Sequence, residues 1–338
     1  MPDLIATSAE AAAWMDEAVA RNADGPVFGR VARSVIWSNA VDADGTLLMP
    51  LDPERLAAQI NGQPYQLLLG HDPGRPLGKA LAAKVFTNSS GDVFVAAVLG
   101  FYENATTLRF GDFGFDVAID AAPPTRLPKL PDDLRFTLAA DPREIDIASL
   151  LEIAREAPIP IDVHERSDNA AGASHTLVVA SVMFVTLVWN PFVTTFANEA
   201  SKDAYAAVRS WLRKLSARLA DRGNPVLELQ SFHGGCAVSF ILRGKDVAHH
   251  YRAHDALDGA ASRAAHLIAQ MRATDLAPVR LVYEFHPTDE LWYPSYAELD
   301  DGRLVSDNIA LIAAERLPSG LSLGLRLTGS NGSEESSA

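Results

Sequence analysis

A histidine and an aspartate stand next to each other in a short turn, where they could carry out acid–base chemistry. The string GHDPGRPLGK, residues 70–79, follows the apolar run Leu67 to Leu69. A histidine at the end of a strand titrates near neutral pH, and the two prolines of this turn restrict its conformation. The arrangement suits His71 as a general base. From the pattern alone, a surface turn in which His71 only hydrogen-bonds the backbone is the more common outcome.

Two serines follow this turn after one expected strand. Ser89 and Ser90 lie in the string NSSGD, residues 88–92. This composition is typical of a polar hairpin turn, and it favours a turn over a nucleophile. Ser90 is retained as a candidate nucleophile for an alternative in which the protein is an active serine peptidase.

A thiol and an imidazole are also close in the sequence. His233 and Cys236 are separated by Gly234 and Gly235. A cysteine beside a histidine can begin a nucleophilic site. A Gly-Gly turn would place the two side chains at opposing ends of a hairpin, and a lone cysteine next to apolar residues is usually a small core residue. The core interpretation is favoured.

Two further histidines have the spacing of metal ligands on a helix. His250 and His254 would share one helix face, with Asp255 adjacent. A zinc or nickel site needs a third and usually a fourth ligand, and the sequence offers none at a recognisable spacing. We therefore expect solvated residues near a helix N-terminus, with no metal and no cofactor.

Aromatic residues cluster in an acidic stretch near the C-terminus. Trp292, Tyr293 and Tyr296 lie within residues 284–301, together with six Asp and Glu residues. Clustered rings can form a recognition surface, and they can equally form the lid of a core. Basic residues are absent here, which argues against a nucleic-acid ligand.

One long segment of the chain has no charged side chain. Residues 169–198 contain no Asp, Glu, Lys or Arg, and Leu177 to Ala197 is just long enough to span a bilayer as a helix. Asn190, Pro191 and many β-branched residues argue against insertion. A buried strand or strand pair is favoured, and membrane contact remains the less favoured alternative.

Composition limits the classes of protein that these residues can belong to. The chain has 338 residues, 48% hydrophobic and 21% charged, with 29 basic against 43 acidic residues and a net charge of −14. Such a chain can bury a sizeable core, and a surface that binds polyanions is not the default. A single cysteine and the absence of a signal-peptide pattern point to a reducing, cytoplasmic compartment.

Two domains of α+β class are expected to position these groups. The predicted organisation is an N-terminal helix (1–25), a β-rich domain (26–120), a Pro-rich connector with a helix (121–170), an α+β domain (171–327) and a disordered tail (328–338). Thr7 and Glu10 have a capping-box spacing for the first helix, and Asp52 with Pro53 begins a second.

The second half of the chain alternates between helix and strand patterns. We expect a helix over residues 203–220, paired strands over 226–230 and 237–242, a long helix over about 250–271 and a strand over 279–285.

The string from His71 to Gly78 resembles the histidine motif H-D-x-x-x-P-I-G of the prohead proteases of tailed phages, which are serine peptidases related in fold to herpesvirus assemblin. The resemblance covers about residues 28 to 120. It implies that His71 is the catalytic base and that the nucleophile lies on a later strand with the pattern S-x-G-F. The comparable string here is DFGF, residues 112–115, with Asp112 in the serine's place. A carboxylate is a poor nucleophile for acyl transfer, so the resemblance implies a degenerate, non-proteolytic copy.

The sequence therefore favours a module that binds or senses a peptide or protein without catalysis. Extended peptides are commonly bound by strand addition. We expect Tyr65, Leu67, Leu69 and Arg75 to line a groove, and Trp292, Tyr293 and Tyr296 to form a second contact. The alternatives are an active serine peptidase and a membrane-active protein that uses residues 177–197. The oligomeric state is open.

Overall fold

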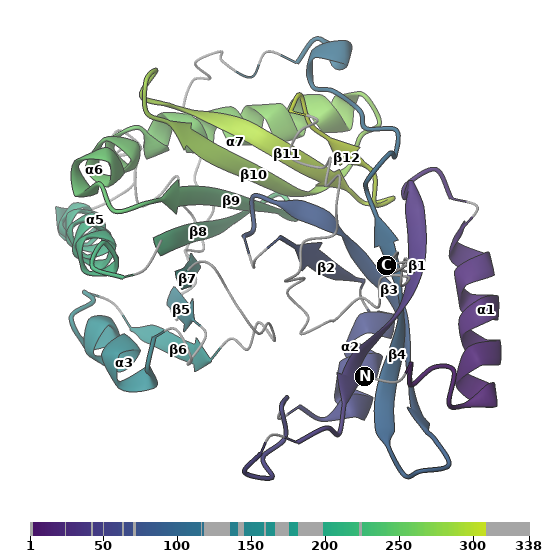
Figure 1. Cartoon of the computed structure of the whole chain (residues 1–338). Coiled ribbons are helices and arrows are strands. Elements are labelled where there is room, and N and C mark those ends of the chain that lie inside the picture. The colour runs from purple at the N-terminus through teal and green to yellow at the C-terminus, as the bar shows by residue number, and fades with distance from the viewer. Residues whose placement is uncertain are drawn as a thin grey trace, which may run out of the picture.

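A computed structural model of the chain shows an α+β fold built on two β-sheets (Figure 1). The structure describes residues 3–23, 25–41, 43–49, 51–62, 64–69, 72–115, 117, 136–140, 145–158, 160–165, 176–181, 199–222 and 225–308.

The N-terminal sheet is antiparallel and has a helix on each face. Its strands are ordered β1-β4-β3-β2. The core on one face includes the buried side of α1, and the core on the other face includes the buried side of α2 (Figure 1). The elements are α1 (Ala9–Ala23), β1 (Arg30–Ser38), α2 (Pro53–Gly62), β2 (Tyr65–Leu68), β3 (Pro76–Thr87) and β4 (Val93–Phe101).

Both helices begin at the residues that the sequence indicates. The Asp52 carboxylate accepts a hydrogen bond from the Arg55 amide at 2.8 Å, which satisfies a free N–H group of the first turn of α2. In α1 the capping group is the Ser8 hydroxyl, which accepts from the Ala11 amide, rather than Thr7. Glu10 instead pairs with Lys84 on β3, and this contact links helix and sheet.

The second sheet is larger and mixed, in the order β12-β11-β10-β9-β8-β7-β5-β6. Helices α3, α5, α6 and α7 cover one of its faces with a common apolar core (Figure 1). The elements are η1 (Gly111–Phe113), β5 (Phe136–Ala140), α3 (Ile147–Arg155), β6 (Ile161–Glu165), β7 (Thr176–Ser181), α5 (Glu199–Leu219), β8 (Pro225–His233), β9 (Cys236–Arg243), α6 (Val247–Asp255), α7 (Leu257–Ala273), β10 (Pro278–His286), β11 (Leu291–Leu299) and β12 (Leu304–Val305).

The segment predicted as a connector supplies part of this larger sheet. The predicted helix is present as α3, and strands β5 and β6 on either side of it pair in parallel with each other. β5 also pairs with β7, so the boundary that we expected at residue 171 falls inside the second unit. The prolines between residues 121 and 131 lie outside the described residues.

The hairpin expected at the two glycines is confirmed. Gly234 and Gly235 both have positive φ, 56° and 87°, and β8 and β9 pair antiparallel on either side of them. Two adjacent positive-φ residues match the right-handed twist of a tight hairpin, which is why glycine suits both positions. The long helix expected next is two helices, α6 and α7, with Ala256 between them.

Part of the uncharged segment is a strand. β7 covers residues 176–181 of it and pairs with both β5 and β8, so this part belongs to the sheet. Residues 169–175 and 182–198 and the expected tail lie outside the described residues. In the described part of the chain, no helix has the length and apolar character needed to cross a membrane.

Gly78 provides a test of how closely β3 and β4 approach. A methyl group on Gly78 would overlap the backbone carbonyl of Gly100, whereas one on Gly62, at the end of α2, would meet nothing within 4 Å. We expect Gly78→Ala to lower the free energy of unfolding by about 1–3 kcal/mol, because the backbone of the paired strand must move. Gly62→Ala is the matched control and should be neutral or stabilising by up to about 1 kcal/mol. Urea unfolding of both variants measures the difference, and equal stabilities would contradict this packing.

Candidate functional site

The turn from Asp72 to Arg75 lies between the two sheets. The Asp72 carboxylate, which is 4% exposed, accepts a hydrogen bond from the Gly74 amide at 2.9 Å. The Asp72 carbonyl accepts from the Arg75 amide at 2.9 Å, and the Arg75 carbonyl accepts from the Leu69 amide at 3.0 Å. These three bonds close a rigid turn that presents Pro73 and Gly74 to the larger sheet.

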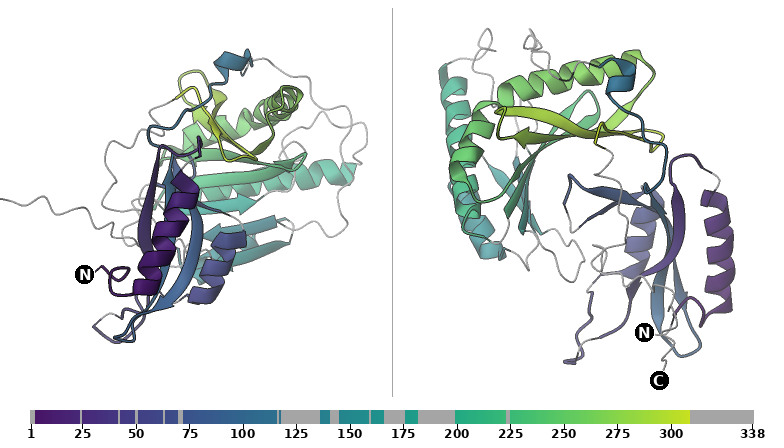
Figure 2. Two further views of the ribbon diagram at one scale, coloured as in Figure 1. Left: turned by 90° about the vertical axis from the view of Figure 1, so that its right-hand side faces the viewer. Right: turned by 45° about the horizontal axis from the view of Figure 1, so that its top comes forward.

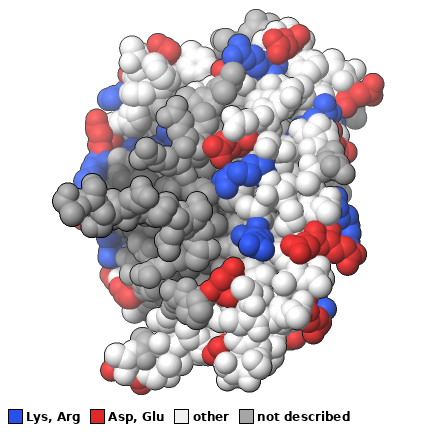
Figure 3. Space-filling view, turned by 45° about the vertical axis from the view of Figure 1, so that its right-hand side comes forward, with Lys and Arg blue, Asp and Glu red and all other residues white. Residues whose placement is uncertain are grey.

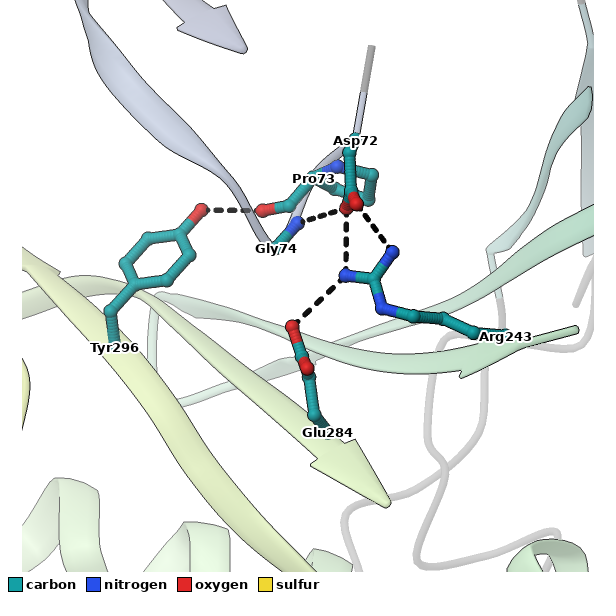
Figure 4. Close-up of polar contacts among 6 residues, drawn as sticks. All are labelled: Asp72, Pro73, Gly74, Arg243, Glu284 and Tyr296. Atoms are coloured by element: carbon teal, nitrogen blue, oxygen red, sulfur yellow. Dashed lines mark hydrogen bonds and ion pairs between the residues drawn. The ribbon is translucent and has the colours of Figure 1, made fainter. Parts of the chain in front are cut away.

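An arginine of the larger sheet holds this turn. Arg243, the last residue of β9, donates from Nη1 and Nη2 to the two carboxylate oxygens of Asp72, at 2.5 and 2.7 Å (Figure 4). Its Nη2 also donates to Glu284 of β10 at 2.9 Å. Burial alone would lower the pKa of Arg243, and the hydrogen bonds and charges of Asp72 and Glu284 outweigh this effect, so the pKa rises.

A buried tyrosine fixes the other side of the turn. The Tyr296 hydroxyl donates to the Pro73 carbonyl at 2.8 Å (Figure 4). The same hydroxyl accepts from Nε2 of Gln66 on β2 at 3.1 Å. Burial raises the pKa of Tyr296, so its hydroxyl keeps the proton that it donates.

A second ion pair and a small apolar cluster complete the contact between the units. Lys79 of β3 pairs with Glu298 of β11 at 2.5 Å, and both side chains are nearly buried. The cluster joins Val27, Phe28 and Tyr102 of the N-terminal unit to residues of the larger sheet such as Ile241 and Val282. The N-terminal unit therefore lies on the face of the larger sheet opposite its helices (Figure 2).

The candidate base is not among the described residues, but the residue after it is. His71 lies outside them, so its position relative to any nucleophile stays a prediction. Both oxygens of Asp72 accept from Arg243, and one also accepts from Gly74. A carboxylate held in this way is occupied by a structural contact.

Asp112 does not lie on a strand, although the resemblance implies a strand at the nucleophile position. It lies exposed in the short 3-10 helix η1. Leu108, four residues earlier, forms a bridge with Val305 of β12, so this segment follows the edge of the larger sheet. Phe110 and Phe115 anchor it by packing into the core on the helix-covered face.

Ser90 occupies the turn that its sequence composition predicts. It lies exposed between β3 and β4, and its amide donates to the Asn88 side chain at 3.0 Å. The same Asn88 oxygen accepts from the Asp92 amide, so this asparagine organises the turn. No described histidine is recorded as a partner of Ser90, and its pairing with His71 is untested because His71 is not described.

The residues expected to line a peptide groove are used inside the N-terminal unit. Leu67 is 2% exposed and lies in the core beneath α2, and Tyr65 and Leu69 pack against the same core. Arg75 is half-buried in the turn itself. Alternate residues of β2 face α2 on one side and the larger sheet on the other, so Leu67 serves as a core residue rather than as the lining of a groove.

The aromatic cluster of the second unit is part of its core rather than a recognition surface. Trp292 and Tyr296 are each 1% exposed. Trp292 donates to the Ala253 carbonyl at 2.9 Å and packs edge-on against Phe240. Tyr293 lies half-buried at the surface, where its hydroxyl donates to Asp289. Of the two interpretations that the sequence left open, the core interpretation is correct for Trp292 and Tyr296.

Cys236, His250 and His254 are core residues, whereas His233 is exposed in the β8–β9 hairpin. Cys236 is fully buried, and burial raises the pKa of its thiol to about 12, which makes it a poor nucleophile. His250 and His254 are also buried, which corrects the expectation of solvated residues. His254 Nε2 lies 3.0 Å from the Ser216 hydroxyl of α5, and His250 Nε2 lies 3.2 Å from the Arg243 carbonyl. Among the described residues, no group of His, Cys, Asp and Glu side chains could hold a metal ion.

Sequence reasoning missed the partners of the turn. Arg243 and Glu284 are 171 and more residues away from Asp72, and neither stands in a recognisable motif. The available signal was the pair of prolines around Gly74, which indicates a turn rigid enough to act as a docking element. On the face that Figure 3 shows, the acidic and basic side chains of the described residues are interspersed.

Comparison of the chain with protein-family models, with curated proteins and with solved structures finds no match.

The ion pair between the units can be measured by a double-mutant cycle. We expect Asp72→Asn and Arg243→Met to be coupled by about 2 kcal/mol, because either change leaves a buried polar group without its partner. Asp301 and Arg303 form an exposed pair and serve as the control, with a coupling below about 1 kcal/mol. Chemical denaturation of the single and double variants supplies the values. Additive effects at Asp72 and Arg243 would show that the ion pair between them does not stabilise the fold.

Because His254 is buried, we expect the free energy of unfolding to fall in mild acid. Burial, together with the charges of His250, Arg213 and Arg209, lowers the pKa of His254 to about 3. In the unfolded chain a histidine binds its proton near pH 6.5, so acid favours the unfolded state below that pH. The contribution of His254 should fall by about 2 kcal/mol between pH 6.5 and pH 5. Denaturation at several pH values should show a shallower slope for His254→Leu, and an unchanged slope would count against this burial.

Proposed function

We propose that this protein is a non-catalytic module that binds a protein or peptide partner. The observation that supports the proposal best is the state of Asp72. In a peptidase of the kind that the His71 motif resembles, this turn would surround the reacting groups. Here its aspartate is held by Arg243 and its proline carbonyl by Tyr296, so the turn serves as a docking element between two domains.

The arrangement of candidate nucleophiles supports the same proposal. Asp112 is exposed on η1 at the edge of the larger sheet, and Ser90 belongs to a solvated hairpin turn. Ser216 and His254 are close enough to form a catalytic serine–histidine dyad, but both side chains are fully buried. Substrate cannot reach a dyad that lies in a packed core.

Binding without chemistry is consistent with the architecture of the N-terminal unit. Strands bind extended chains through their backbone groups, and this ability does not depend on a nucleophile. Function depends on the site rather than on the fold, so the site must be tested directly.

Active-site labelling tests the absence of catalysis. We expect no adduct when the purified chain is treated with a fluorophosphonate probe, because among the described residues Ser90 lies in a hairpin turn and Ser216 is buried. His71→Ala and Ser90→Ala are the matched controls and should be indistinguishable from the unaltered chain. A stoichiometric adduct that either substitution abolishes would establish the peptidase alternative and overturn this proposal.

Selection from a displayed library of random twelve-residue peptides tests the binding itself. We expect saturable binding of individual selected peptides at micromolar concentrations. Failure to select any peptide, in a library that yields binders to a control domain, would contradict a peptide-binding role.

A further inference from the structure

Strand β1 forms one edge of the N-terminal sheet and is long for an edge strand. It has nine residues and pairs with β4 alone among the described strands. Edge strands carry unpaired backbone groups that can bind a further strand, and proteins often keep such edges short or distorted. β1 is distorted only near its end, where the register shifts between Val35 and Trp37.

The register shows which backbone groups of β1 face outward. The Asn39 amide donates to Val93 and the Tyr102 amide donates to the Leu77 carbonyl, so odd-numbered residues of β4 bond β1 and even-numbered ones bond β3. Val31 and Arg33 lie opposite Gly100 and Val98, which are even-numbered. The N–H and C=O groups of Val31 and Arg33 therefore point away from β4, toward the free edge.

Both faces beside this edge are lined by packed helices. Val31 and Val35 pack in the core that includes α1, and Ala32 and Ile36 belong to the core that includes α2. Figure 2 shows α1 running along the sheet. After Ser38 the chain turns into a small hairpin in which Val41 bridges Leu47. The part of β1 that is open to another strand therefore ends near Ser38. The edge can accept a short extended segment.

We infer that the partner is an extended peptide of another protein, which adds as a strand to the outer edge of β1. This peptide places a carboxylate beside Arg33. The inference rests on the proposed function. Arg33 is exposed and has no ion pair with any described residue, whereas its neighbour Arg30 pairs with Glu103. Opposite charges on adjacent strands favour pairing, and like charges oppose it.

A second copy of the chain fits this edge less well. A two-fold register centred on Arg33 would bring Arg33 opposite Arg33, and like charges directly opposite are destabilising, so only a register centred elsewhere, such as on Ala32, avoids this clash. Each copy also carries a net charge of −14, which adds general repulsion.

The peptides selected on the chain provide the probe. We expect a bound peptide to slow amide hydrogen exchange at Val31 and Arg33, whose N–H groups face away from β4, and to leave the exchange of the larger sheet unchanged. Protection confined to another part of the chain would overturn the inference about β1 and leave the proposed function standing. Absence of any binding peptide would overturn both.

Arg33→Pro separates the backbone contact from the fold. Proline removes an outward N–H that the sheet does not use, and edge strands tolerate proline at such positions. We expect peptide affinity to fall at least about tenfold with little change in the unfolding transition. Ser34→Pro is the contrasting variant: Ser34 lies opposite odd-numbered Ala97, so it should lose sheet stability.

Arg33→Glu tests the charge. Affinity for peptides that carry a carboxylate should fall about three- to tenfold, whereas Arg155→Glu on the distant helix α3 should have no effect. Equal binding by Arg33→Glu would overturn the assignment of an acidic residue to the partner. Sedimentation that shows a dimer, lost in Arg33→Pro, would identify a second copy as the occupant and overturn the inference.

Discussion

The two halves of the molecule depend on one buried carboxylate. Removing Asp72 from water costs free energy that only a well-aligned partner offsets, and the fork of Arg243 supplies two parallel hydrogen bonds for it. Because a guanidinium and a carboxylate are planar, this contact sets orientation as well as distance. Tyr296 then holds the other side of the turn, and the ion pair of Lys79 with Glu298 links β3 to β11.

The two faces of the larger sheet differ in polarity. One face is apolar and packs against four helices, which gives it most of the buried core. The opposite face carries Arg243, Glu284 and Glu298. Asp72 and Lys79 of the N-terminal unit pair with Arg243 and Glu298, and Glu284 pairs with Arg243 of its own sheet. Docking removes these groups from water, and the ion pairs offset the cost of that removal.

Local signals in the sequence were sufficient for individual elements. Asp52 with Pro53 marks the start of α2, and the two glycines mark the β8–β9 hairpin, because both features depend on backbone chemistry within a few residues. Burial of Trp292 and the position of Asp112 could not be predicted, since both depend on contacts with distant parts of the chain. The role of Asp72 was missed for the same reason: a histidine beside an aspartate has the same appearance in a catalytic turn and in a docking turn.

The turn from Asp72 to Arg75 contacts residues that come much later in the chain, and this has a consequence for synthesis on the ribosome. The strands of the N-terminal sheet all lie within residues 30–101, but Asp72 meets a partner 171 residues later and Pro73 one 223 residues later. During translation, the turn from Asp72 to Arg75 therefore stays exposed until Tyr296 has been synthesised. Pauses or truncations before that point leave a half-finished molecule with this turn open to chaperones and proteases.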